Sequence, residues 1–536
     1  MSEQAADAVV IGAGPNGLVA ANLLADAGWD VVVLEAQPEP GGAVRTSRWP
    51  SPDYLADDCS AFYPLAAASP AITGLHLEDH GLHWLRTPAV LAHPLLDGRC
   101  ATLHSDLECT VAELDEFGAG DGAAWRRLYE LWERVGDELV GALFTPFPPV
   151  RAAARIARRL GPAGLLRFAR FALLPVRRLA EEEFAGPGAL LLAGCALHTD
   201  LMPESAGSAT FGWLLAMLAQ QVGFPVPEGG AAQLTAAMVR RLEARGGQVR
   251  CNSRVQQVVV RRGRATGVRT TDGTEVRAHY AVLADVDAPQ LYADLVGWDH
   301  LPPRLRDDMR RFHWDFATFK VDFALRGKMP WSAEVASAAG TVHLAADLDE
   351  MTDYTAQLAT GRIPARPFLL VGQMTTADPS RSPVGTESLW AYTHVPREVR
   401  GDAGGDLSGD WNADAERFAD RIEEQLERFA PGMREQISDR RISTPLGLQA
   451  HDANLVGGAI NGGTTAIHQQ LVFRPVPGLG RPETPIAGLY LASASAHPGG
   501  AVHGACGANA ARAALVGRRM RSARATSWLT RKAIGE

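Results

Sequence analysis

Lysine is scarce in this 536-residue chain: only Lys320, Lys328 and Lys532 occur, so almost all of its 52 basic residues are arginine. Cysteine is sparse as well. The six cysteines contain no Cys-x-x-Cys pair, which excludes the common zinc-binding and redox-dithiol motifs. We therefore predict no metal site, and a reducing, cytoplasmic setting fits this cysteine content. The cysteines are Cys59, Cys100, Cys109, Cys195, Cys251 and Cys506.

Long apolar runs are also missing. None reaches the roughly 18 residues that a membrane-spanning helix requires, and the first apolar stretch does not have the form of a secretory signal. The net charge of −9 counts against general nucleic-acid binding. With 46% hydrophobic residues, the chain is long enough to form two domains with buried cores. We expect a folded cytoplasmic protein with no nucleic-acid partner.

The first 35 residues contain a dinucleotide-binding pattern. An apolar stretch at 8–11 ends in Gly12, Gly14 and Gly17, and a helix-compatible run follows. Gly12 permits a tight turn, Gly14 lets the backbone approach a pyrophosphate, and Gly17 lets helix and strand pack closely. A second apolar stretch ends at Glu35, near the offset of about 20 residues at which a carboxylate accepts hydrogen bonds from ribose hydroxyls. The pattern predicts a Rossmann-type dinucleotide site.

Two further glycine-rich segments distinguish FAD from NAD. Gly41 and Gly42 follow the second strand, and residues 488–514 fit a buried strand, a glycine loop and a helix of small residues beginning at about Val502. These segments resemble those of phytoene-desaturase-like flavoproteins, which include carotenoid ketolases and belong to the wider amine-oxidase-type superfamily. The resemblance implies that FAD is the cofactor and that both ends of the chain converge on it. The further contacts that it implies are Pro15, Ala43, Arg45, Val255, Ser495, Gly500, Ala501 and Val502.

The order of the expected elements predicts a chain that passes repeatedly between two domains. A helix at 231–245 leads into a β-meander over 248–277, and 280–284 returns to the parallel sheet. We predict the α/β class, with a Rossmann-type FAD-binding domain (parallel sheet plus β-meander) interleaved with a discontinuous α+β substrate and cap domain. No second Gly-x-Gly-x-x-Gly follows a strand, so we expect no second NAD(P) domain. The predicted boundaries are 1–75, 221–295 and 446–520 for the FAD-binding domain, 76–220 for a mainly helical cap, 296–445 for the second substrate segment and 521–536 for a basic tail.

Lys320 is the first candidate for a catalytic role. Apolar and polar residues alternate over 319–325, which places Lys320 on the face opposite the apolar one. The stretch resembles the strand on which amine-oxidase-type flavoproteins carry a lysine that holds a water near flavin N5. The alternative is a lysine on a solvated sheet face. His497 and His503 flank the C-terminal glycine loop and are further catalytic candidates, against the alternative that they only hydrogen-bond to nearby backbone groups.

Three functions fit these patterns. The first is oxidation of a largely apolar substrate, of polyprenoid or carotenoid type, by desaturation or ketone formation with hydride transfer to flavin N5 and with oxygen or a quinone as electron acceptor. The second is amine oxidation, although residues 491–527 contain no aromatic side chain and Ala501 lies where amine oxidases place a ring that frames the amine. The third is a flavin-binding interaction protein with little turnover.

A basic and apolar segment predicts contact with a membrane. Residues 151–178 contain eight arginines and no acidic residue, interleaved with leucine, isoleucine and phenylalanine. Gly161, Pro162 and Pro175 divide the segment into pieces too short to cross a bilayer but able to lie in its interface. We predict peripheral binding to an anionic membrane surface, to which the basic tail contributes. The alternative is a cap helix whose arginines pair with acidic residues such as 181–183.

Overall fold

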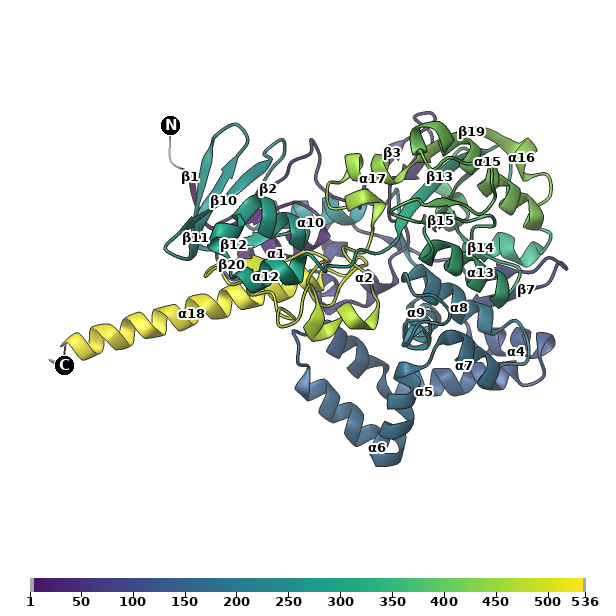
Figure 1. The fold of residues 1–536 in the computed structure, drawn as a ribbon, viewed down its shortest axis with the longest axis horizontal. Helices are drawn as coiled ribbons and strands as arrows, with labels where there is room; N and C mark the ends of the chain where they lie inside the picture. Colours follow the sequence, from purple (N-terminus) through teal and green to yellow (C-terminus); the bar gives the residue numbers. More distant parts are fainter. Residues whose placement is uncertain (1–3, 534–536) are drawn as a thin grey trace.

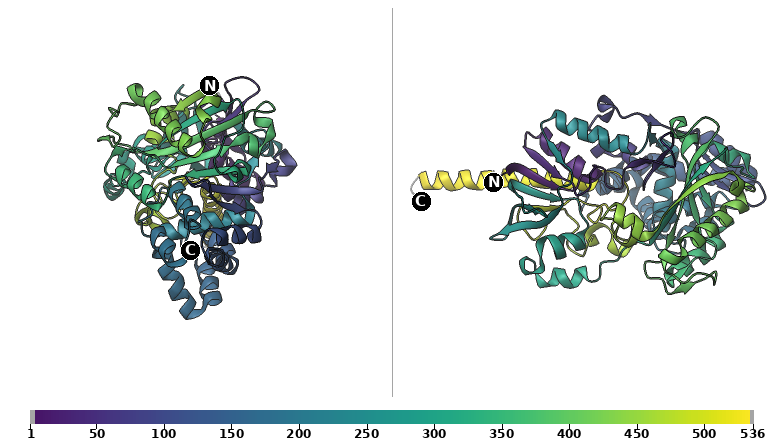
Figure 2. Two further views of the ribbon diagram at one scale, coloured as in Figure 1. Left: turned by 90° about the vertical axis from the view of Figure 1, so that its right-hand side faces the viewer. Right: turned by 90° about the horizontal axis from the view of Figure 1, so that it is seen from above.

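Two seven-stranded sheets form the framework of the molecule, one at each side of Figure 1. The structure is a computed structural model that describes residues 4–533, with side chains for residues 5–520. Trp528, Leu529 and Lys532 belong to the basic tail that is predicted to contribute to membrane contact, and their side chains lie outside the described residues. The right-hand view of Figure 2 shows the two sheets apart, joined by loops and short helices.

The first sheet combines parallel strands with an antiparallel meander, as the sequence predicts. β1 lies between β12 and β2, and the strands β20, β12, β1, β2 and β9 run parallel, whereas β10, β11 and β12 pair antiparallel. Apolar side chains fill both faces of β1, which is the usual reason for a continuous apolar run in a parallel strand. The strands are β1 (Gln4–Ile11), β2 (Val31–Leu34), β9 (Gln248–Arg250), β10 (Val255–Arg261), β11 (Arg264–Thr270), β12 (Glu275–Ala284) and β20 (Leu489–Leu491).

Three helices pack on one face of this sheet and supply its core. They are α1 (Pro15–Asp26), α10 (Ala232–Ala244) and α18 (Ala505–Ala533). The last helix begins three residues later than the predicted start at Val502. Ala501 and Gly504 have φ values of +74° and +66°, and this left-handed backbone is incompatible with a helix. α18 continues well beyond the sheet and projects from the molecule (Figure 1).

The second sheet is largely antiparallel, in the order β19-β13-β17-β16-β14-β6-β7. Two of its strands come from the segment 76–220, for which the sequence predicts a mainly helical cap. Two short apolar runs, 89–94 and 100–104, pair around the turn at Asp97 and Gly98 and add a hairpin to the sheet. The strands are β6 (Ala89–Pro94), β7 (Cys100–His104), β13 (Ala317–Leu325), β14 (Ala339–Leu344), β16 (Leu369–Gln373), β17 (Glu387–Val395) and β19 (Ile437–Ser443).

Helices cover both faces of the second sheet. α15 (Trp411–Phe429) packs on the face that carries Phe319 and Phe323, whereas α8 and α9 share a core with the opposite face. The predicted α/β class with an interleaved α+β part is confirmed by this architecture, and the exact domain boundaries stay a prediction. The cap helices are α4 (Leu107–Phe117), α5 (Asp121–Leu143), α6 (Val150–Leu173), α7 (Val176–Glu183), α8 (Ala189–His198) and α9 (Ser208–Val222).

α6 is the part of the cap that extends furthest from the sheets (Figure 1). The helix is kinked at Gly161, whose φ of +66° and ψ of +175° are not helical, and Pro162 follows directly. Its apolar face packs on α9 and α5 only in part, because Leu165, Leu166 and Leu173 remain exposed. The predicted division of this segment at Gly161 and Pro162 is therefore present in the fold.

Candidate functional site

A cavity of about 610 Å³ lies between the two sheets and is lined by both ends of the chain. The β1–α1 loop contributes Gly12, Gly14 and Pro15, and the end of β2 contributes Glu35. Val255 lines the cavity from the start of β10. The opposite wall is formed by the second sheet, and segments that are hundreds of residues apart in the chain thus meet in one site.

The glycine loop after β1 has the tight geometry expected of a phosphate-binding turn. A Cβ atom on Gly17 would lie 2.2 Å from the carbonyl oxygen of Gly12, so only glycine fits there. Gly17 itself does not line the cavity, and its N–H donates to Oδ2 of Asp285 at 2.8 Å. A Cβ on Gly14 would lie 2.9 Å from the same Oδ2. Gly14 therefore keeps the backbone open towards the cavity, and Gly17 allows helix α1 to pack closely.

Glu35 is held rigidly at the end of β2. Its Oε2 accepts a hydrogen bond from the N–H of Ala13 at 2.7 Å, and its Oε1 accepts from the N–H of Gln37 at 2.8 Å. The residue is buried but lines the cavity. A carboxylate fixed in this way beside a glycine loop is well placed to accept from the hydroxyls of a ribose.

The second glycine pair shapes the loop next to this site. Gly42 and Ala43 line the cavity, whereas Gly41 and Arg45 do not. The N–H of Gly41 donates to the carbonyl of Ala13 at 2.9 Å, and Nε of Arg45 donates to the carbonyl of Gly42 at 3.0 Å. Gly41 and Arg45 thus hold the loop in place, and Gly42 and Ala43 present its backbone to the cavity.

The C-terminal glycine loop closes the same cavity from the other end of the chain. Ser495, Gly500, Ala501 and Val502 all line the cavity. The hydroxyl of Ser495 donates to the carbonyl of Gly462 at 2.9 Å, which ties this loop to the segment 460–465. The convergence of the N-terminal and C-terminal loops that the sequence predicts is therefore present.

Lys320 is buried in the cavity wall, so the alternative of a lysine on a solvated sheet face is wrong. It is 2% exposed, lines the cavity and forms an ion pair with Asp322 on the same face of β13. The other carboxylate oxygen of Asp322 accepts from Nη2 of Arg441 at 3.0 Å, and Arg441 also reaches Oδ1 of Asp58 at 3.2 Å. Each charge in this series of ion-paired residues has an opposite neighbour, which offsets the cost of removing it from water.

Apolar and aromatic side chains form a further part of the cavity lining. Trp390 and Tyr392 on β17 stack at a centroid distance of 5.7 Å, with an angle of 27° between the rings. The remaining apolar lining comes mainly from the cap helices and from the segment that follows β4 (Leu55–Asp57). These side chains are Phe62, Leu65, Leu143, Phe211, Leu214, Leu215 and Phe224.

Comparison with known families agrees with this geometry. Residues 10–93 match the NAD(P)-binding Rossmann-like domain, and residues 104–515 match the family of flavin-containing amine oxidoreductases. The chain belongs to the flavin-containing amine oxidoreductase family. It is therefore an FAD-dependent oxidoreductase enzyme, and the resemblance to phytoene-desaturase-like flavoproteins is confirmed.

Several known proteins are similar to this chain along almost their whole length. Pyridine nucleotide-disulfide oxidoreductase domain-containing protein 2 of Mus musculus is 28% identical, with 94% of this chain and 92% of the relative covered. A lycopene-forming phytoene desaturase of Pseudescherichia vulneris is 27% identical, with 95% and 98% covered. Among solved structures, wild-type putrescine oxidase bound to putrescine has a TM-score of 0.58 at 16% identity, with 98% of this chain and 100% of that chain covered. The structural likeness shows the shared fold.

The residues that line the cavity of this chain fit an FAD molecule. A backbone cradle that side chains would fill lies at Gly14 and Gly42, the N-terminus of α1 faces it, and Glu35 lies beside it. Ser495, Val502 and Lys320 line the same cavity. Bound FAD supplies the group that accepts a hydride from the substrate.

The two histidine candidates have neighbours that favour the structural alternative. Nε2 of His503 lies 3.0 Å from the carbonyl oxygen of Gly500, and its Nδ1 accepts from the N–H of Ala505 at 3.0 Å. Both ring nitrogens are therefore used locally, although the ring lines the cavity. Nε2 of His497 lies 3.1 Å from the carbonyl oxygen of Thr145, and His497 is not part of the cavity lining. Burial lowers the pKa of each histidine to about 4, so both are neutral at pH 7.

Asp285 is a site residue that the sequence analysis missed. It follows β12 directly, accepts from Gly17 at the N-terminus of α1 and lines the cavity. Burial raises its pKa to about 7. A signal for it exists in the sequence, because the carboxyl ends of parallel strands are where ligands bind in such sheets.

Asp315 and Arg474 were also missed, and both hold the loop 460–465 that forms part of the cavity wall. The carboxylate of Asp315 accepts from the N–H groups of Ile460, Asn461 and Gly463 at 2.7–3.1 Å. Arg474 is fully buried and donates to backbone carbonyl oxygens within and beside that loop. No sequence signal points to these contacts, because Asp315 and the loop are about 145 positions apart.

The described residues offer neither a metal site nor a membrane-spanning helix. No group of three or more His, Cys, Asp and Glu side chains within the described part of the chain is arranged to hold a metal ion. No helix of that part combines the length and the apolar character needed to cross a bilayer.

Proposed function

We propose that this FAD-dependent oxidoreductase removes two hydrogens from a largely apolar small molecule, by desaturation or by conversion to a ketone. The observation that carries the proposal is the apolar lining of the cavity, to which Phe211, Leu214, Leu215, Phe62 and Leu65 contribute. Relatives named as phytoene desaturases support the same substrate class. A polyprenoid or carotenoid-like substrate fits best, with oxygen or a quinone as the electron acceptor.

The side chains of the cavity would promote this reaction by position and by exclusion of water. Apolar walls hold the substrate and keep water away from the transferred hydride, which strengthens each electrostatic interaction inside. We propose that Lys320, held by Asp322, supplies a positive charge beside the flavin, and that Gly12, Gly14, Pro15, Glu35, Gly42, Ala43, Val255, Ser495, Gly500, Ala501 and Val502 contact FAD. One hydrogen of the substrate would leave as a hydride, which bound FAD would accept, and the other as a proton, which would be released to bulk water.

Analysis of the product tests the proposal. The purified enzyme would be incubated with a panel of isoprenoids and of amines, and the products identified by mass spectrometry. We expect a product that has lost two hydrogen atoms from an isoprenoid, with no release of ammonia. Turnover of amines alone, with release of ammonia or of a shortened amine, would contradict the proposal.

Amine oxidation is the second candidate function. The stacked pair of Trp390 and Tyr392 in the cavity wall favours it, because aromatic faces bind ammonium groups. The absence of aromatic residues from 491–527 of the sequence, with Ala501 where a framing ring is expected, counts against it. The product panel above separates the two functions.

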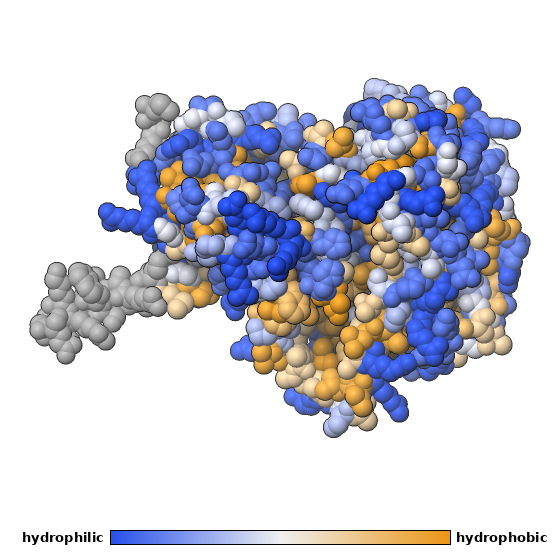
Figure 3. All heavy atoms as spheres, viewed as in Figure 1, coloured by the Kyte–Doolittle hydropathy of each residue, from blue (hydrophilic) through white to orange (hydrophobic). Residues whose placement is uncertain are grey.

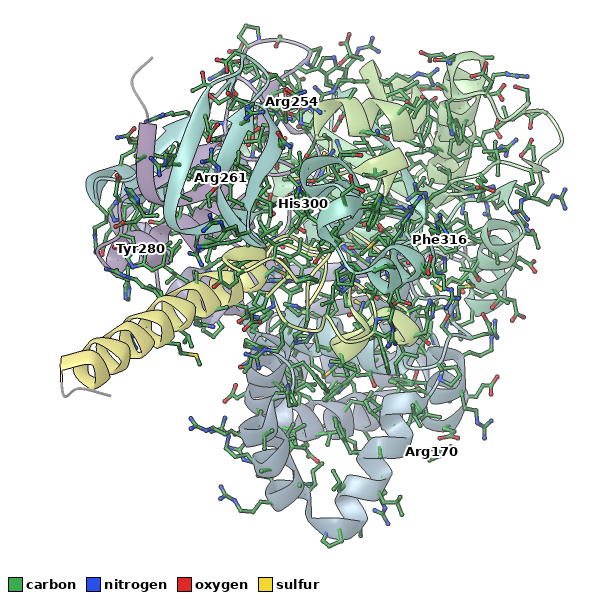
Figure 4. The ribbon with its side chains drawn as sticks, turned by 60° about the vertical axis from the view of Figure 1, so that its left-hand side comes forward. Arg170, Arg254, Arg261, Tyr280, His300 and Phe316 are labelled. Carbon is green, nitrogen blue, oxygen red and sulfur yellow. The ribbon has the colours of Figure 1, made fainter. Side chains whose placement is uncertain are left out.

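We also propose that the substrate is taken up at a membrane surface through the cap. Figure 3 shows apolar residues gathered over the part of the surface formed by α6, around a hollow. Five of the eight arginines of this region form ion pairs with acidic residues, as the alternative interpretation predicts. They are Arg155, Arg159, Arg170 (labelled in Figure 4), Arg177 and Arg178. Arg151, Arg158 and Arg167 are exposed and have no ion pair with the described residues, and Leu165 and Leu166 of the same helix are exposed too.

A further inference from the structure

Both faces of the second sheet are buried; one is apolar, and the other combines apolar side chains with several polar ones. On β13, Phe319, Val321 and Phe323 belong to the core beneath α15. The opposite face carries Lys320 paired in register with Tyr392, and continues across the sheet to Thr341 and His343 on β14. This polar face forms the wall of the cavity. A cavity that takes only hydrocarbon has no need for such a wall.

One corner of this polar face contains hydrogen-bonding groups without partners. The hydroxyl of Thr341 and Nδ1 of His198 are shielded from water and have no partner among the described residues, and the same is true of both ring nitrogens of His343. An unsatisfied buried polar group costs about 1–3 kcal/mol, and native proteins contain few of them without a reason. Thr318 has the same property but lies on β13, three strands away.

Of the three residues with unpartnered groups, Thr341 and His198 border the cavity and His343 lies next to His198. The rings of His198 and His343 lie 6.2 Å apart, and those of His198 and Tyr392 also lie 6.2 Å apart. Thr341 is two residues before His343 on the same face of β14. Thr341, His198 and Tyr392 all line the cavity. A rotation of 120° about χ1 of Thr341 moves its hydroxyl to another staggered position, so the hydroxyl can turn to a ligand.

The charges at this corner indicate the chemistry of the missing partner. Lys320 is neutralised by Asp322, whose second oxygen is taken by Arg441. Burial lowers the pKa of His198 to about 4 and that of His343 well below its usual value, so both rings are neutral. The corner therefore offers neutral donors and acceptors, and no free charge for a carboxylate or an ammonium group.

We propose that the substrate is amphipathic, and that a neutral hydroxyl or carbonyl group at its end hydrogen-bonds to Thr341 and His198 while its apolar part lies against Phe211, Leu214 and Leu215. This inference rests on the proposed oxidation of an apolar molecule and narrows its substrate class. The partnerless groups at the corner would then be satisfied in the complex. A hydrocarbon of the same shape would leave them unsatisfied and bind more weakly.

Binding of two matched ligands to the FAD-loaded enzyme tests the inference. Farnesol and farnesene share a carbon skeleton but differ in the hydroxyl group. Dissociation constants would be measured anaerobically from the perturbation of the flavin absorbance, for the wild type and for Thr341→Val, His198→Phe and Thr102→Val. The control, Thr102, is a buried threonine of the same sheet on β7, outside the cavity lining.

We expect the wild type to bind farnesol at least about tenfold more tightly than farnesene. Thr341→Val and His198→Phe should each reduce this ratio several-fold through weaker farnesol binding, with farnesene unaffected. Without ligand, Thr341→Val should unfold at the same or a higher temperature than the wild type, because an unsatisfied hydroxyl is replaced by a methyl of the same size. Thr102→Val should leave the ratio unchanged.

Two outcomes would contradict the inference alone, and a third would contradict both the inference and the proposed function. Equal affinities for farnesol and farnesene in the wild type would contradict the polar contact. An affinity ratio that is unchanged in both cavity variants would contradict it as well. In either case, reduction of the flavin by one of these ligands would still support the oxidation of an apolar molecule. If neither ligand binds or reduces the flavin and amines do, the proposed function and the inference both fail.

Discussion

At the scale of single residues, the buried pair of Lys320 and Asp322 is the feature most open to test. Lys320→Met should slow reoxidation of the reduced flavin by roughly ten- to a hundredfold, because a positive charge stabilises the negative charge that develops there. Substrate affinity should change little. Stopped-flow measurement of the two half-reactions separates these effects.

The double variant Lys320→Met/Asp322→Asn is the control for this prediction. Removing one partner of a buried ion pair costs about 3–5 kcal/mol, so the single variant should also unfold more readily. The double variant should recover much of that stability and none of the rate. Wild-type reoxidation in the double variant would show that Lys320 has only a structural role.

A second prediction concerns the effect of Asp285 on the pH dependence of folding stability. Its pKa is raised to about 7 by burial, so between pH 4 and pH 7 the unfolded chain has released this proton while the folded protein retains it. The folded state then binds more protons, and stability falls as pH rises through this window, by roughly 4 kcal/mol for a shift of this size. Above pH 7 this loss of folding stability is complete and does not grow further.

Thermal unfolding at several pH values measures this effect. The decline in the midpoint from pH 5 to pH 8 should be smaller in Asp285→Asn than in the wild type. Asp299→Asn, at an exposed aspartate, should follow the wild type. An Asp285→Asn profile that parallels the wild type would contradict the assignment.

At the scale of elements, we propose that the loop between β1 and α1 determines whether FAD binds. Gly14→Val should give folded but colourless protein, because the new side chain would enter the cavity near Asp285. Gly14 has an ordinary φ of −71°, so no backbone strain accompanies the change. Gly401→Ala is the matched control, since a Cβ there meets no atom within 4 Å. Flavin absorbance of the purified variants, with circular dichroism to verify folding, gives the result; a yellow Gly14→Val protein would contradict it.

Elements whose sequence signals are local could be predicted, and those fixed by distant contacts could not. The β1–α1 loop, the meander and the division of β13 into two faces follow from glycine spacing and periodicity, which act over a few residues. The hairpin of β6 and β7 was missed because each strand is short and its partner β14 lies more than 200 residues further along the chain. The late start of α18 depends on the positive φ values of Ala501 and Gly504.

The same contrast holds inside the site. Glu35 could be placed from its offset after the glycine loop, and Lys320 from the alternation of β13. The roles of Asp315 and Arg474 could not be predicted, because their partners are backbone groups of a loop that only the folded chain brings near them. The local hydrogen bonds of His503 likewise appear only once the turn at Gly499 and Gly500 is formed.

At the scale of the whole molecule, the proposed membrane contact is tested by co-sedimentation with liposomes. We expect binding to anionic and not to neutral vesicles, weakening as salt rises, because exposed charges are screened. The double variant Leu165→Ser/Leu166→Ser should bind less, since these side chains are exposed on α6. Val384→Ser, at a fully exposed position outside the cap, is the control. Equal recovery of the wild type in the supernatant with both vesicle types at low salt would contradict the proposal.

The central claim is that one cavity binds FAD and an apolar substrate together, and anaerobic reduction of the flavin tests it most directly. The purified yellow protein would be mixed, without oxygen, with isoprenoid alcohols and hydrocarbons and, separately, with amines, and the flavin absorbance followed. The account predicts bleaching by an isoprenoid, fastest for one that carries a hydroxyl group, and full recovery of colour when oxygen or a quinone is admitted. Bleaching by amines alone, or a protein that is purified without flavin and does not bind added FAD, would contradict it.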